Sequence, residues 1–82
     1  MTMGELQSVT ELRPYGQIVF HLREQMEARG LTRNALCRLS NTRFEVVNKW
    51  YHGEVERIDA DVLARFCFVL QCSVSDLIEY RS

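Results

Sequence analysis

The side chains most capable of covalent or acid–base chemistry are few and scattered along the 82-residue chain. Three cysteines, Cys37, Cys67 and Cys72, form no Cys-x-x-Cys pair, and no histidine is placed to complete a zinc site. His21 and His52 stand alone, and no nucleophile is spaced to pair with a general base. We therefore expect no enzyme activity, no cofactor and no metal, and we interpret the cysteines as small buried apolar residues.

A different chemistry, the binding of anions, is indicated by the middle third of the chain. Residues 33–57 hold five basic and three acidic side chains, a surplus of two positive charges, although the whole chain has a formal net charge of −1. The total charge argues mildly against a nucleic-acid partner, whereas the local surplus is the modest footprint of a phosphate-binding surface. A surplus this small also arises by chance. The basic residues are Arg33, Arg38, Arg43, Lys49 and Arg57.

Two short helices must position these side chains. Thr32 is a good N-cap for a first helix, which we expect over residues 32–39. A tight turn at Ser40–Asn41 follows, and Thr42 then stands three residues before Glu45, the spacing of a capping box. We therefore predict a second helix over residues 42–52, packed on the first through Leu36, Leu39, Val47 and Trp50.

A preceding helix is predicted by an apolar stripe. Ile18, Leu22 and Met26 recur every four residues, which is the spacing of one helix face. The stripe begins after Gly16, and Gly30 is a suitable C-terminal cap because glycine tolerates a left-handed backbone.

Capping residues predict two further helices in the last third of the chain. Asp59 can cap the fourth helix, and Ser73 with Asp76 can cap the fifth, which is carried to the chain end by Leu77, Ile78 and Tyr80. The expected fold class is all-α, with five helices in one domain over residues 15–82. Residues 1–14 form an N-terminal arm without a clear pattern, and a short strand there remains open.

Two short helices that meet at a steep angle across a tight turn form the helix-turn-helix unit. In such a unit the second helix lies in the major groove of DNA, and the first lies across the backbone. The segment 32–53 has the lengths and caps that this unit needs. No apolar run is long enough to cross a membrane, and the first residues lack a secretory core, so we expect a cytoplasmic protein.

The chain from about Ile18 to Tyr80 resembles the Xre-like helix-turn-helix family, which includes the phage Cro and repressor proteins. Its tail resembles the last two helices of that family, in the Ile58–Asp59 entry and the Asp76–Leu77 pair. The chain departs from the family at Asn41 and Arg43, where a glycine and a Ser or Thr cap are usual. The matching motif residues are Gly30, Leu31, Thr32, Cys37 in the small-residue position, Val47, Trp50 and Gly53.

The resemblance implies a phage-repressor-like regulator of transcription that binds double-stranded DNA, with roles for particular residues. Arg33 matches a position that touches phosphate, and residues 42–52 form the recognition helix. The positions that reach base edges are Phe44, Glu45, Asn48 and Lys49. Thr42 opens that helix, and further phosphate contacts are expected from Arg43, His52 and Arg57.

Several alternatives remain open at this point. Glu45 can be the capping partner of Thr42, and Phe44 can pack on its own helix near Val47 or Tyr51. A protein-interaction or antitoxin-type module on the same fold is the competing function, favoured by the low net charge. We expect a homodimer, and the candidate apolar residues for its surface are Leu6, Val9, Leu12, Ile78 and Tyr80.

Overall fold

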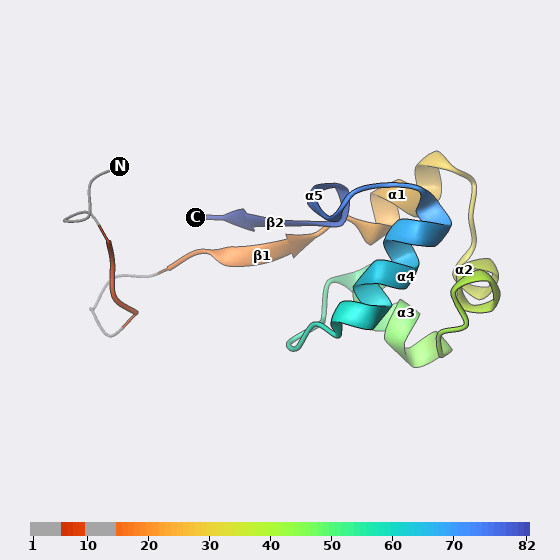
Figure 1. Ribbon diagram of the computed structural model, residues 1–82, viewed down its shortest axis with the longest axis horizontal. Coiled ribbons are helices and arrows are strands. Elements are labelled where there is room, and N and C mark those ends of the chain that lie inside the picture. Colours follow the sequence, from red (N-terminus) through yellow and green to blue (C-terminus); the bar gives the residue numbers. More distant parts are fainter. Residues whose placement is uncertain (1–5, 10–14) are drawn as a thin grey trace.

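The computed structural model describes residues 6–9 and 15–82. The helices gather at one end of the molecule, and a pair of strands extends away from them (Figure 1). Of the predicted arm over residues 1–14, only residues 6–9 are described. The elements in chain order are β1 (Gln17–Phe20), α1 (Leu22–Ala28), α2 (Arg33–Ser40), α3 (Phe44–His52), α4 (Ala60–Leu70), α5 (Val74–Leu77) and β2 (Ile78–Arg81).

The two strands lie far apart in the sequence and form a small antiparallel sheet (Figure 1). Gln17 lies opposite Arg81, and Phe20 lies opposite Ile78. Gly16 precedes the sheet at a point where an added Cβ would lie 2.2 Å from the carbonyl oxygen of Arg81. The close approach of the two backbones therefore requires glycine at this position.

This sheet corrects the all-α prediction at both ends of the domain. The first helix does not include Ile18 but begins at Leu22, and the last helix ends at Leu77 instead of continuing through Tyr80. Both mispredicted segments are short and rich in β-branched and aromatic residues, which favour strands when a partner strand is present. The fold is therefore mostly helical, with five helices and one two-stranded sheet among the described residues.

Three of the helix caps expected from the sequence are confirmed. Thr32 Oγ1 accepts a hydrogen bond from the backbone N–H of Ala35 at 3.1 Å. Asp59 Oδ1 accepts from two backbone N–H groups in the first turn of α4, at 2.8 and 3.3 Å. At α5 the backbone N–H of Ser73 donates to Asp76 at 2.9 Å, and this bond lowers the pKa of the Asp76 carboxyl. Local sequence signals therefore fix where these helices begin.

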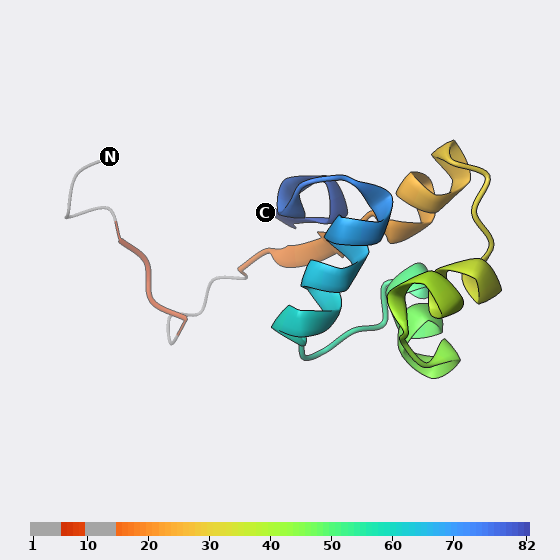
Figure 2. The ribbon, with the colours of Figure 1, turned by 45° about the vertical axis from the view of Figure 1, so that its right-hand side comes forward.

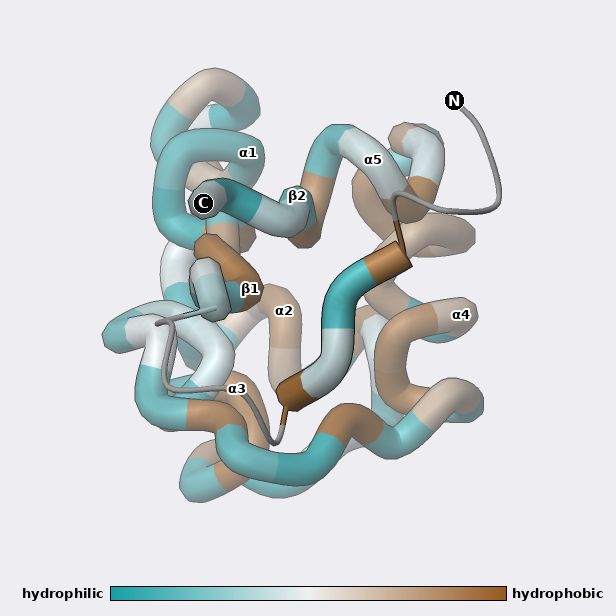
Figure 3. Tube along the Cα trace, turned by 90° about the vertical axis from the view of Figure 1, so that its left-hand side faces the viewer, coloured by the Kyte–Doolittle hydropathy of each residue, from teal (hydrophilic) through white to brown (hydrophobic). Residues whose placement is uncertain are grey.

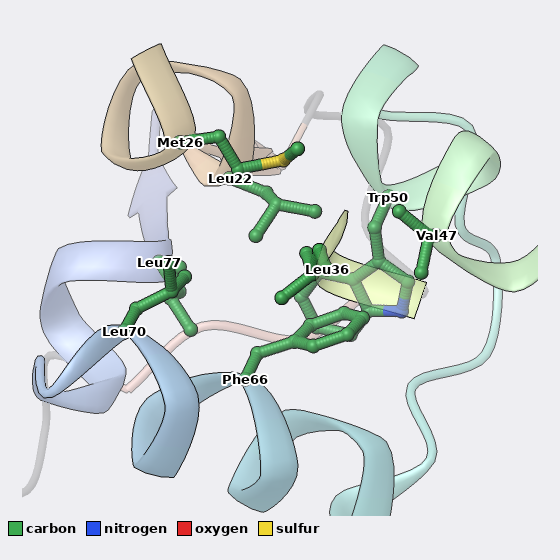
Figure 4. Packing of buried hydrophobic residues seen from close by; sticks show 8 residues of the cluster. All are labelled: Leu22, Met26, Leu36, Val47, Trp50, Phe66, Leu70 and Leu77. Atoms are coloured by element: carbon green, nitrogen blue, oxygen red, sulfur yellow. The ribbon is translucent and has the colours of Figure 1, made fainter. Parts of the chain in front are cut away.

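One hydrophobic core joins the sheet to the helices (Figure 4). The Trp50 ring meets Phe20 of β1 at 5.1 Å and Phe66 of α4 at 5.3 Å between centroids, both edge to face. Helix α4, which supplies Phe66, is hydrophobic along most of its length (Figure 3). The buried members are Leu22, Met26, Leu36, Val47, Trp50, Phe66, Leu70 and Leu77, which confirms the inward positions predicted at residues 36, 47 and 50.

Leu39, in contrast, does not belong to the core as predicted. Its side chain is 59% exposed, and the neighbouring Ser40 is buried instead. The Ser40 hydroxyl donates to the carbonyl oxygen of Leu36 at 2.6 Å, so its burial leaves no polar group unsatisfied. Leu39 lies beside Phe68, which is 83% exposed, in a hollow between α2 and α4. The apolar stripe of α2 is therefore narrower than the sequence indicates.

The three cysteines are half-buried and pack against the core. Burial raises the pKa of the Cys37 and Cys72 thiols, because the thiolate would lose hydration. None of the three forms a disulfide. Their positions agree with the expected role as small apolar residues, although none is fully buried.

His21 has close polar partners, which the sequence does not indicate. Its Nδ1 bonds the Glu24 carboxylate at 2.9 Å, and its Nε2 bonds Glu79 of β2. These hydrogen bonds raise the pKa of His21 and lower the pKa of both carboxyls. The His21 backbone N–H also donates to the carbonyl of Leu77 at 2.7 Å. Together these contacts hold β2 against the start of α1.

Candidate nucleic-acid interface

Helices α2 and α3 pack together (Figure 2). Between them Asn41 adopts a left-handed backbone with φ of 49°, which asparagine tolerates better than most residues. This conformation explains how asparagine replaces the glycine usual in such a turn. Arg65 of α4 donates to the carbonyl oxygen of Asn41 at 2.8 Å and pairs with Asp61 at 2.8 Å. The predicted turn is confirmed, and Arg65 braces it without having been singled out from the sequence.

The start of α3 differs from the prediction by two residues. Arg43 is the N-cap, the helix runs from Phe44, and the Arg43 side chain makes no capping hydrogen bond. Thr42 Oγ1 donates instead to the carbonyl of Ser40 at 3.0 Å, so the predicted capping box between Thr42 and Glu45 does not form. The Thr42 hydroxyl is used by the turn, and the open alternative in which Glu45 caps this helix is wrong.

Arg33, at the start of α2, lies over the side chains of α3. Its Nη1 donates to Asn48 Oδ1 at 2.6 Å. Its guanidinium carbon lies 4.6 Å from the ring centroid of Tyr51 and 5.8 Å from that of Phe44. These cation–π contacts and the hydrogen bond join the first helix of the motif to the outer side of the second.

Arg23 of α1 extends this cluster in a way that the sequence does not reveal. Its guanidinium carbon lies 5.2 Å from the Tyr51 ring centroid, and its Nε donates to Glu27 at 3.1 Å. Tyr51 therefore contacts two guanidinium groups, from Arg23 and Arg33. No spacing rule relates residues 23 and 51, because only the packing of α1 on α3 brings them together.

Phe44, Glu45, Asn48 and Lys49 share one side of α3, since residues three and four apart lie on the same helix face. Glu45 and Lys49 are exposed, and neither side chain forms a hydrogen bond or ion pair with any described residue. Phe44 is 44% exposed and lies near the Arg33 guanidinium. Asn48 is half-buried beside Arg33. The structure therefore brings the four predicted base-reading residues together on an open face.

Arg57 lies in the loop after α3, close to Lys49. Both residues line one hollow, together with Glu54 and Glu56. The two carboxylates partly offset the two basic charges at this corner of the surface. Arg57 therefore lies beside the open face of α3, which we call the recognition face, but its positive charge is offset by nearby carboxylates.

Arg43 and His52 are exposed and stand at opposite ends of α3. A helix rises about 1.5 Å per residue, so their positions are separated by roughly 13 Å along its axis. His52 packs edge to face on Tyr51 at 5.3 Å between ring centroids. The predicted phosphate-contacting side chains are thus spread along α3 and do not form one patch.

Comparison with protein families identifies the class of domain. Residues 21–81 match the family described as the Cro/C1-type helix-turn-helix (HTH) DNA-binding domain. The matched segment includes α2, the turn, α3 and all of β2. The chain therefore belongs to the Cro/C1-type HTH family of DNA-binding domains, and the Xre-like resemblance found in the sequence is confirmed. No curated protein matches the chain.

Metal-binding clusters and membrane-spanning helices are absent from the described residues. Within residues 6–9 and 15–82, no three His, Cys, Asp or Glu side chains gather in a way that would hold a metal ion. None of the helices in this part of the chain combines the length and apolar character that a membrane span requires.

Proposed function

We propose that the chain is a transcriptional regulator that recognises a specific sequence in double-stranded DNA and represses by covering it. Helix α3 enters the major groove, and α2 lies across the sugar–phosphate backbone. The observation that carries this proposal is the open face of α3, where base-reading side chain types stand together without covering structure. They are Phe44, Glu45, Asn48 and Lys49.

Each of these side chains has chemistry suited to a base edge. Lys49 donates to the acceptors of guanine, and Glu45 accepts from the amino group of cytosine. Phe44 offers an apolar surface to the methyl group of thymine, and Asn48 offers an amide. Because the set mixes donors, an acceptor and an apolar ring, it selects among base pairs and does not simply attract DNA.

The phosphate contacts flank this face. Arg33 retains N–H groups beyond the one that bonds Asn48, and it stands at the N-terminal end of α2, where backbone N–H groups favour anions. Arg43, His52 and Arg57 are exposed and add donors along α3 and its following loop. Thr42 contributes through the turn geometry, since its hydroxyl bonds Ser40.

A homodimer on a palindromic site completes the proposal, because a two-fold protein matches a two-fold operator. Leu6, Val9 and Tyr80 are exposed, whereas Ile78 packs against the core and Leu12 lies outside the described residues. The exposed apolar pair Leu39 and Phe68 adds a surface that the sequence did not suggest. Sedimentation across protein concentrations tests this point, and a monomer at every concentration would contradict it.

The competing function is protein interaction, either by a partner-binding regulator or by an antitoxin-type module. The observation that favours this function is the presence of three acidic side chains on or near the recognition face, Glu45, Glu54 and Glu56. A protein partner would bind with little dependence on salt, because no condensed counterions are released from DNA. The salt dependence of binding therefore separates the two functions.

Selection of bound sequences from a random duplex pool tests the proposed function. We expect one enriched motif, and we expect Lys49→Ala to weaken binding to it about fivefold or more, the lower range for a specific base contact. Arg81→Ala is the matched control, because it removes the same charge from β2, whose end points away from α3 (Figure 1). Lack of enrichment, or equal effects of the two substitutions, would contradict the proposal.

A further inference from the structure

The amide of Asn48 has a fixed orientation relative to Arg33. A guanidinium group has only donors, so the amide atom that faces Arg33 Nη1 at 2.6 Å must be the acceptor Oδ1. The Asn48 nitrogen, Nδ2, is then the end of the amide that does not face Arg33 Nη1. An asparagine without such a neighbour is free to turn either end of its amide toward a base.

The Arg33 side chain is itself held in place. Its guanidinium lies over two aromatic rings, 4.6 Å from the centroid of Tyr51 and 5.8 Å from that of Phe44. Arg23 approaches the same Tyr51 ring at 5.2 Å, so Tyr51 is held by contacts with two arginines from two helices. The hydrogen bond to Asn48 is therefore made by a group with little freedom to leave.

The pair consequently presents mainly donors to the groove, because the bond from Arg33 uses one of the two lone pairs of Asn48 Oδ1 and turns this oxygen toward the arginine. Adenine shows one acceptor and one donor in the major groove, and an amide matches both only if its oxygen is available. Guanine shows two acceptors, N7 and O6, and no donor on that edge. A pair that presents mainly donors therefore matches guanine better than adenine.

We propose that Arg33 is a specificity-determining residue, which orients Asn48 so that the pair selects guanine at one base pair of the site. This inference rests on the proposed function, because it assumes that α3 reads the major groove. It differs from a phosphate contact by Arg33, which would add affinity without changing which base is preferred. The two roles are compatible, but only the first alters sequence preference.

Replacement of Arg33 by methionine separates these roles, since it keeps most of the apolar stem and removes all donors. We expect the selected motif to change at one position, where the preference for guanine over adenine falls about tenfold or reverses. The matched control is Arg23→Met, which removes the other guanidinium from Tyr51 but leaves the bond between Arg33 and Asn48 intact. The control is expected to keep the motif of the wild-type protein.

A second measurement begins with the wild-type protein and a modified duplex. 7-Deazaguanine at the selected position removes the N7 acceptor, and we expect binding to weaken about tenfold, while the same base elsewhere in the flanks has no effect. Asn48→Ala should abolish the preference at that position, and adding Arg33→Met to it should change the preference no further. Thermal unfolding of each variant shows that it is folded.

The outcomes distinguish this inference from the proposed function. If the wild-type protein enriches no motif, the proposed function fails. If it enriches a motif but Arg33→Met weakens binding equally to all sequences with an unchanged motif, only the inference is overturned. An unaltered affinity for the 7-deazaguanine duplex would overturn it as well, whatever the stability of the variants.

Discussion

Arg33 and His21 illustrate how single side chains in this protein join different elements of the fold. Arg33 of α2 bonds Asn48 of α3, and His21 at the start of α1 bonds Glu79 of β2. Each bond includes a charged or chargeable group that lies only partly in solvent. Such bonds are stronger than neutral ones, and their loss is measurable either as altered specificity or as altered stability.

The contacts of His21 predict a pH dependence of stability. Hydrogen bonds to Glu24 and Glu79 raise the pKa of the folded His21 ring above its ordinary value, which the unfolded chain keeps. The stabilisation is therefore complete below the ordinary pKa and is lost as pH rises through the raised pKa. We expect urea denaturation to give a free energy of unfolding up to about 1 kcal/mol lower at pH 8 than at pH 6, the range for a partly exposed ion pair.

The carboxyl partners act in the opposite direction in acid. Their pKa values are lowered in the folded protein, so their contribution to stability is present above the ordinary carboxyl pKa and is lost as pH falls through the lowered pKa.

His21→Gln is the control for the comparison of pH 6 with pH 8, because glutamine keeps hydrogen-bonding capacity without a proton to titrate. A wild-type protein with the same stability at pH 6 and pH 8, or a His21→Gln variant with the full pH dependence, would contradict this account.

At the scale of the helix, α3 begins without the capping side chain that most helices of this length use. Arg43 holds the N-cap position with an extended backbone, φ −63° and ψ 149°, yet its side chain makes no capping hydrogen bond. The first backbone N–H groups of α3 therefore point outward without a partner side chain at the cap. An arginine at this position lacks the stabilisation that a capping side chain would give, and it places a positive charge at the edge of the recognition face.

Arg43→Ser is accordingly expected to stabilise the protein while weakening its affinity for DNA. A serine hydroxyl at this position accepts from the first turn, and we expect the free energy of unfolding to rise by about 0.5–1 kcal/mol. Denaturation by urea measures the stability, and titration with the selected duplex measures the affinity. Arg57→Ser makes the same change in a loop and should leave stability within about 0.5 kcal/mol of wild type. An Arg43→Ser variant no more stable than wild type would refute the expectation.

The sequence predicts the helices well where the signal is local. Caps at Thr32, Asp59 and Ser73 each involve residues at most three apart, so residues close in the sequence are enough to predict them. The predicted cap of α3 is wrong, because the Thr42 hydroxyl could bond either the first turn of the helix or the turn before it. The left-handed backbone of Asn41 directs the Thr42 hydroxyl to the carbonyl of Ser40. That choice depends on the turn, which spacing alone does not describe.

At the scale of the whole molecule, the features missed by the sequence are those that join distant segments. Ile18 continues the spacing of Leu22 and Met26 and so predicts a helix, but the residue becomes part of a strand because β2 lies beside it. A strand partner about sixty residues away leaves no trace in a local pattern. The bond from Arg33 to Asn48 was missed for the same reason, although both residues were correctly placed on the motif.

The core gives the sheet a role in holding the recognition helix. Trp50 of α3 contacts Phe20 of β1 on one side and Phe66 of α4 on the other. Because β1 pairs with β2, the strands at both ends of the domain help to hold the helix that is proposed to enter DNA. Helix α3 is thus packed against α1, α2 and β1, and Trp50 also meets Phe66 of α4.

The most direct test of a DNA-binding face on α3 is the affinity of the wild-type chain for its selected duplex, measured by fluorescence titration over a range of salt concentrations. We predict a steep fall, with a logarithmic slope of about −3 to −4 for four phosphate contacts, and binding roughly a thousandfold tighter than to a duplex of shuffled sequence. Equal affinity for the two duplexes, or an affinity that does not change with salt, would contradict it.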